Sequence, residues 1–110
     1  MRIPNSDRAV IESSKLTEYL LNIEHKRGGA KAKLPIQFGY SIDNWERLEA
    51  DIRQFHLTQD VTVIKETDYG TRYEISTSLM TPVERPLVVK TVWQIDIGTD
   101  IPRLITLVPD

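Results

Sequence analysis

The segment from His25 to Lys33 concentrates the residue types that could contact a phosphate. It holds one histidine, two adjacent glycines, no acidic residue and four cations, namely Lys26, Arg27, Lys31 and Lys33. Glycine lets backbone N–H groups approach a ligand closely, and a helix beginning beside it would add its positive dipole end. His25 is the residue in this segment that titrates near neutrality, so it could transfer protons. The segment lacks the glycine spacing of a Walker loop, and a solvated charged loop is the alternative interpretation.

A second polar set lies on the strands predicted for the second half of the chain. Lys90 lies among apolar neighbours, so its charge must reach solvent or a partner such as Glu74 on the neighbouring strand. Strand alternation places Thr91 and Trp93 on one face, but whether Arg72 shares a cleft with Thr91 depends on strand register. A basic, hydroxyl-bearing sheet face opposite the histidine-containing segment would form a cleft for a phosphodiester. The set comprises Arg72, Lys90, Thr91, Arg103 and Thr106.

The other histidine, His56, is predicted at the end of a long helix, beside Phe55 and Leu57. A cationic histidine there would stabilise the helix C-terminus electrostatically, and we assign it no catalytic role. Two histidines and no cysteine do not predict a zinc site, and thiolate catalysis and disulfides are excluded. We therefore expect no metal and no cofactor.

Apolar spacing in the first half of the chain predicts the helices that would position these groups. A short helix is expected over residues 13–21, with a serine cap. A second short helix over residues 30–38 conflicts with Pro35, because proline is tolerated only in a first turn. The longest helix is predicted over residues 42–57 after the cap residue Ser41. Its apolar side chains recur every three or four positions, at Trp45, Leu48, Ile52 and Phe55.

The hydrophobic period changes to two after Asp60, which predicts strands. The connections are short, with a hairpin turn over residues 68–71, so the strands should form an antiparallel meander. Residues 9–11 could add a short edge strand. The fold class is therefore α+β, with N-terminal helices packed on a four-stranded antiparallel sheet in a single domain, residues 1–110. The four strands are expected over residues 61–65, 72–79, 87–95 and 103–108.

Composition limits the classes of function. Lys and Arg number 14 against 16 Asp and Glu, a net charge of −2, so any nucleic-acid contact must be local. No apolar run approaches the roughly 20 residues of a membrane span, and the first residues carry no signal-peptide core. We expect a cytoplasmic protein that makes no contact with a membrane.

Four segments, residues 22–32, 69–73, 89–93 and 102–106, resemble the motif series of a family of small bacterial domains of unassigned activity. These domains occur as stand-alone cyanobacterial proteins and as C-terminal domains of polymorphic toxins. A looser resemblance links the chain to the barnase, EndoU, colicin and RelE-like group of metal-independent ribonucleases. That group implies helices before a four-stranded antiparallel sheet, and a cleft lined by an early His or Lys and by late Arg, Ser or Thr. This chain departs from the family at Pro35, where a helix would usually continue.

Two functions follow from different classes. In the first, the chain is a toxin-like endoribonuclease domain that needs no metal and is controlled by a small antitoxin or immunity protein. Its catalytic residues would be His25, Lys31, Arg72 and Thr91: His25 as general base or acid, Lys31 and Arg72 stabilising the phosphorane, and Thr91 orienting the phosphate. In the second, the chain is a non-catalytic binding or assembly module. Phosphate or RNA contacts are predicted for Lys26, Arg27, Lys33, Lys90, Arg103 and Thr106.

Overall fold

A computed structural model describes residues 1–21 and 36–109 of the chain. Four strands form one sheet in the order β1-β2-β3-β4, and each strand is antiparallel to its neighbours. The predicted α+β fold with an antiparallel meander is confirmed. The observed bounds lie within two residues of the predicted ones: β1 is Val63–Thr67, β2 is Gly70–Met80, β3 is Pro86–Asp96 and β4 is Arg103–Pro109.

The hairpin between β1 and β2 forms where the sequence predicts it. Thr67 pairs with Gly70, so Asp68 and Tyr69 make a two-residue turn. Gly70 has a φ of 145°, and a Cβ at this position would lie 2.1 Å from the carbonyl oxygen of Ile95. Glycine is therefore required here both for its backbone conformation and for the close approach of β3.

The longest predicted helix is confirmed, although its hydrogen-bonding pattern changes along its length. It begins with a 3₁₀ turn over Ile42–Asn44, continues as α2 over Trp45–Asp51 and ends in π-type turns over Ile52–His56. Ser41 is the N-cap residue, and its backbone N–H donates to Asn44 Oδ1 at 2.7 Å. This bond satisfies a backbone donor next to the helix start.

The short helix predicted over residues 13–21 is also present, as π-type turns over Lys15–Leu20 that follow a helical start at residues 13–14. A 3₁₀ turn over Ser6–Arg8 precedes it. The expected edge strand is reduced to a single parallel bridge between Val10 and Arg103. Most of the second predicted helix lies outside the described residues. In the described part of the chain, no helix is long and apolar enough to span a membrane.

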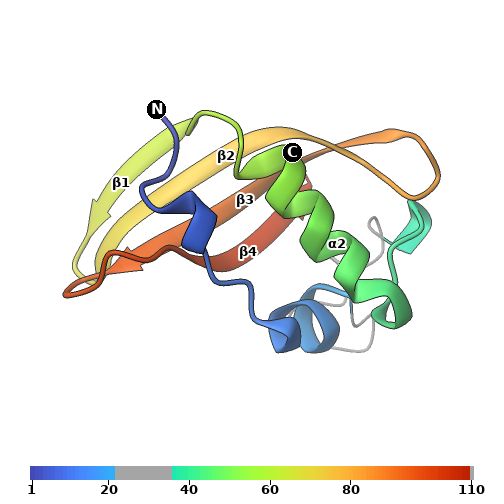
Figure 1. The fold of residues 1–110 in the computed structure, drawn as a ribbon, viewed down its shortest axis with the longest axis horizontal. Coiled ribbons are helices and arrows are strands. Elements are labelled where there is room, and N and C mark those ends of the chain that lie inside the picture. Colours follow the sequence, from blue (N-terminus) through green and yellow to red (C-terminus); the bar gives the residue numbers. More distant parts are fainter. Residues whose placement is uncertain (22–35, 110) are drawn as a thin grey trace.

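The core lies between the helical layer and one face of the sheet, and Figure 1 shows α2 crossing that face. Leu48 and Ile52 are almost fully buried, while Trp45 and Phe55 are partly buried and pack against the same cluster. The predicted apolar stripe is therefore the core-facing side of the helix. Its partners on the sheet include Tyr73, Ile75, Val89 and Trp93, which are all buried.

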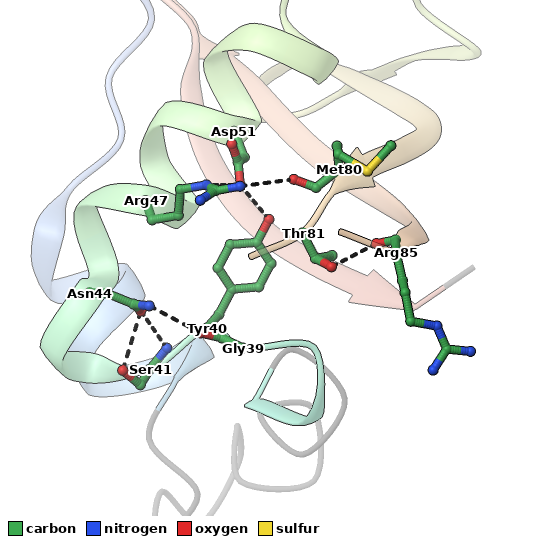
Figure 2. A network of polar contacts seen from close by, with 9 residues as sticks. All are labelled: Gly39, Tyr40, Ser41, Asn44, Arg47, Asp51, Met80, Thr81 and Arg85. Atoms are coloured by element: carbon green, nitrogen blue, oxygen red, sulfur yellow. Dashed lines mark hydrogen bonds and ion pairs between the residues drawn. The ribbon is translucent and has the colours of Figure 1, made fainter. Parts of the chain in front are cut away.

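A buried polar network joins α2 to the segment that precedes it (Figure 2). The Tyr40 hydroxyl donates to Asp51 Oδ2 at 2.6 Å, and Arg47 Nε donates to the same oxygen at 2.9 Å. Arg47 Nη2 also reaches the carbonyl oxygen of Met80 at 3.4 Å, so the network extends to the end of β2. Burial and the bond to Asp51 raise the pKa of Tyr40 well above its usual range, so its hydroxyl stays a donor.

Candidate functional site

The register of the sheet decides which of the predicted polar residues share a face. Arg72 pairs with Gln94, and Gln94 pairs with Arg103, so these three side chains project from the same side. By the same rule, Lys90 and Thr106 project from that side too, through their pairing with Ser76 and Val92. We call this side, opposite the core, the outer face. It carries Arg72, Glu74, Ser76, Lys90, Val92, Gln94, Arg103 and Thr106.

At one end of the outer face, two arginines are held by a chain of hydrogen bonds. Arg72 Nε donates to Gln94 Oε1 at 3.0 Å, and Gln94 Nε2 donates to Asp96 Oδ1 at 2.6 Å. Arg103 donates to both oxygens of Asp96, at 2.8 and 3.2 Å. Hydrogen bonds from Arg103, and then from Gln94, lower the pKa of Asp96, and the bond to Asp96 raises the pKa of Arg103. Both arginine side chains are therefore oriented before any ligand arrives.

At the middle of the outer face, Glu74 lies between two lysines. Its carboxylate oxygens are 3.5 Å from Lys65 Nζ and 3.7 Å from Lys90 Nζ. The expected pairing of Lys90 with Glu74 is confirmed. Across Val92 from Glu74 lies Thr106, whose Oγ1 is the buried side-chain oxygen that has no hydrogen-bond partner in the described part of the chain.

Thr91 lies on the opposite side of the sheet, which we call the inner face. It is fully buried, and its hydroxyl accepts from Trp93 Nε1 at 2.9 Å and lies 2.7 Å from His56 Nδ1. Thr91 and Trp93 therefore share a face, as alternation predicts. Arg72 and Thr91 point to opposite sides of the sheet, so they do not share a cleft. The sequence alone could not decide this, because it depends on strand register.

His56 completes this inner network as an uncharged side chain. Its Nε2 lies 3.1 Å from the carbonyl oxygen of Thr77, which can only accept, so Nε2 carries the proton and Nδ1 accepts from Thr91. Burial lowers the pKa of His56 to about 4, and the bond to Thr77 offsets that effect only in part. The interpretation of His56 as a cation that stabilises the helix C-terminus is therefore wrong, because desolvation keeps the ring neutral at neutral pH.

The segment from His25 to Lys33 lies outside the described residues, and so does Pro35. The roles of His25, Lys26, Arg27, Lys31 and Lys33 therefore stay predictions. Within residues 1–21 and 36–109, no group of three or more acidic or histidine side chains is arranged to hold a metal ion.

An open cavity of about 350 Å³ lies away from the outer face, between the N-terminal segment and the end of the long helix. Asp7 and the carbonyl end of the helix offset the two arginines there, so the cavity has no clear preference for an anion. None of the predicted site residues lines it. Its walls are Arg2, Ser6, Asp7, Arg53, Leu57 and Thr58.

Sequence reasoning missed the acidic members of the outer face as parts of a site. Glu74 enters it only as a partner for Lys90, and Gln94 and Asp96 do not enter it at all. The available signal was strand alternation, because Arg72 and Glu74, or Gln94 and Asp96, are two residues apart and must share a face. The alignment of the strands was the missing information.

Comparisons with known proteins place this architecture. A chain of a solved structure titled "Contact-dependent growth inhibition toxin - immunity protein complex from Klebsiella pneumoniae 342" has the same fold, with a TM-score of 0.70. The match has 14% sequence identity and covers 92% of this chain and 99% of that one. The search of curated proteins gives no match. A family model described as "Domain of unknown function (DUF6883)" matches residues 2–110, so the chain belongs to the DUF6883 family.

Proposed function

We propose that this chain is a toxin-like endoribonuclease domain that cleaves RNA phosphodiesters without a metal ion. The observation that carries the proposal is the convergence of Arg72, Lys90 and Arg103, from three adjacent strands, on one face of the sheet. Cleavage of a phosphodiester builds negative charge on the phosphorus oxygens in the transition state. Cations held in place before the reaction stabilise that charge without paying for reorganisation.

The roles follow from position on the outer face. Arg72 is held through Nε, which leaves its terminal nitrogens to stabilise the phosphorane together with Lys31. Lys90 and Arg103 contact flanking phosphates, as do the cations of the segment around His25. Thr106 takes the phosphate-orienting role that the sequence suggests for Thr91, because Thr91 is committed to the core. His25 stays proposed as the general acid, which would protonate the leaving oxygen in place of water.

Control by a partner protein is part of this proposal. The fold is shared with a chain from a complex of a toxin and an immunity protein, which supports it. An unchecked ribonuclease would damage the RNA of the cell that makes it. We therefore propose a small immunity or antitoxin protein that covers the outer face.

A binding module is the second candidate, and one observation favours it. Glu74 and Asp96 already pair with cations of the outer face, and the whole chain has a net charge of −2. Paired cations attract RNA less strongly than free ones. In this alternative the outer face docks a protein and no bond is broken.

The deciding experiment incubates the purified chain with total RNA, with and without EDTA. We expect cleavage that persists in EDTA and a growth defect when the chain is expressed without a partner. Arg72→Gln should reduce the cleavage rate about 10²-fold, the scale seen when one transition-state donor is removed. His25→Ala and Lys31→Ala should relieve the growth defect.

The matched control is Arg8→Gln, which removes the same charge from an exposed position in the turn before the helices. It should leave cleavage unchanged. Absence of RNA cleavage together with normal growth on expression would instead favour the binding module. Equal loss of activity in both arginine variants would show that total charge, and no particular site, governs the reaction.

A further inference from the structure

We propose that Glu74 is the general base of the reaction on the outer face, an assignment that rests on the proposed ribonuclease function. The first argument is position. Glu74 lies on β2 two residues after Arg72, and its cross-strand partner Val92 leads to Thr106 on β4. It is therefore the carboxylate at the centre of the face, with Arg72 and Lys90 on either side of it.

The second argument concerns its hydrogen bonds. The Glu74 side chain is only 16% exposed, yet in the described part of the chain its carboxylate makes two ion pairs and no hydrogen bond. The Glu74 oxygens are not among the fully buried atoms that lack a partner, so water and a ligand can reach them. Both ion pairs, at 3.5 and 3.7 Å, are longer than the usual 2.7–2.9 Å of a close charge-assisted bond. The carboxylate oxygens therefore keep lone pairs that are free to accept a proton.

The third argument is the surface around it. Val92 is 8% exposed and forms an apolar floor between Glu74 and Thr106. The Thr106 hydroxyl oxygen is buried and has no hydrogen-bond partner in the described chain, so it can donate to a phosphate oxygen only where a ligand displaces the atoms that cover it. A ribose placed over Val92 would bring its 2′-hydroxyl to Glu74 and its phosphate to Arg72, with Lys90 beside a flanking phosphate.

The chemical step balances with these groups and water alone. A Glu74 oxygen removes the proton of the ribose 2′-hydroxyl while the 2′-oxygen forms a bond to the adjacent phosphorus. The bond from phosphorus to the 5′-oxygen breaks, and the leaving oxygen takes a proton from water. The products are a 2′,3′-cyclic phosphate and a 5′-hydroxyl, and Glu74 then returns its proton to the hydroxide that remains.

The competing explanation is that Glu74 is only a counter-ion for Lys65 and Lys90. The two explanations predict different kinetics. A counter-ion affects folding or RNA affinity, whereas a base affects kcat and leaves binding in place. Removing the negative charge should in fact tighten RNA binding, because the outer face becomes more positive.

The experiment compares Glu74→Gln with Glu49→Gln. Glu49 is a matched control, since it is a half-buried carboxylate paired with Arg53 at 3.1 Å on the helical side of the molecule. With an RNA oligonucleotide as substrate, Glu74→Gln should lower kcat about 10²–10⁴-fold and keep or tighten RNA binding. The control should match the wild type in kcat, and a 2′-deoxy oligonucleotide should be bound but not cut.

Rescue separates a missing base from a damaged fold. In Glu74→Ala, added formate should restore part of the cleavage, because a small carboxylate can occupy the space and accept the proton. Thermal unfolding of each variant shows whether it is folded. Any variant that is unfolded is replaced by Glu74→Asp, which keeps the charge. If formate did not rescue Glu74→Ala, the assignment would be overturned. A wild-type kcat in Glu74→Gln would overturn it as well.

The outcomes also distinguish failure of the Glu74 assignment from failure of the proposed ribonuclease function. If the wild type produces 2′,3′-cyclic phosphates and Glu74→Gln does so equally fast, Glu74 is not the base and the ribonuclease function stands. If the wild type cuts no RNA, both fall together. If cleavage needs a divalent ion that EDTA removes, the metal-independent mechanism falls, and Glu74 as its base falls with it.

Discussion

The inner and outer faces of the sheet place the same residue type in opposite situations, and two threonines show the difference. Thr91 on the inner face uses its hydroxyl as both acceptor and donor, between Trp93 and His56. Thr106 on the outer face has a buried hydroxyl oxygen without a partner among the described residues. The Thr91 hydroxyl therefore stabilises the fold with both of its hydrogen bonds, while the Thr106 hydroxyl leaves its hydrogen-bonding capacity unused.

The contrast extends to the charged groups. On the inner face, His56 is neutral and both of its ring nitrogens have partners. On the outer face, Glu74 keeps two long ion pairs at the surface of the sheet. A closed network is expensive to break, because each orphaned buried group loses its partner and regains no water. Changing a surface group with long ion pairs, such as Glu74, should alter the free energy of unfolding only slightly.

Thr91→Val should produce the largest effect on stability. Valine keeps the shape but leaves Trp93 Nε1–H and His56 Nδ1 buried without a partner, and each orphaned group costs about 2 kcal/mol. We expect a loss of about 4 kcal/mol in the free energy of unfolding, measured by denaturant titration. A loss no larger than that of an exposed threonine variant such as Thr58→Val would contradict the closed network.

Acid should destabilise the protein through His56. Its pKa is lowered from 6.5 to about 4 in the folded state, so the unfolded chain binds the proton first as pH falls. The stability that this histidine contributes is therefore complete above pH 6.5 and is lost between pH 6.5 and 4. The loss is about 3 kcal/mol, since one pKa unit corresponds to about 1.4 kcal/mol.

Denaturant titrations at several pH values would measure this dependence. His56→Gln provides the reference, because it removes the titrating ring and should flatten the free energy of unfolding across the same pH window. An unchanged slope in that variant would assign the acid sensitivity to other groups.

Thr106→Val should have the smallest effect on stability, and of the opposite sign. Replacing a buried hydroxyl that lacks a partner with a methyl group removes a desolvation penalty, so we expect a gain of about 1 kcal/mol. Under the proposed function, RNA cleavage should fall in the same variant. Increased stability with unchanged cleavage would remove Thr106 from the site, and decreased stability would reveal a partner for its hydroxyl.

Particular residues show how far sequence reasoning reaches. The stripe of Trp45, Leu48, Ile52 and Phe55 predicts the long helix and its buried side, because helical periodicity is a local property. Alternation predicts the strands and the shared face of Thr91 and Trp93 for the same reason. The pairing of Lys90 with Glu74 could also be anticipated, since a charge on an apolar strand needs a partner.

His56 shows where that reasoning fails. Its place at a helix end suggests a cation, but its charge depends on burial beneath β2 and β3, which no local pattern reveals. The residues that share the outer face could not be predicted for a related reason. Arg72, Glu74, Lys90, Gln94 and Arg103 come from three strands, and a shift of one residue in register would move any strand's set to the other face.

The sequence by itself therefore determined the long helix, the four strands, their order and the apolar side chains that they bury, because these depend on spacing along the chain. Only the tertiary structure decided that Thr91 belongs to the core while Thr106 and Glu74 face outward. The physical reason is that a site across neighbouring strands depends on their alignment, and that alignment is set by the packing of the whole sheet against the helix.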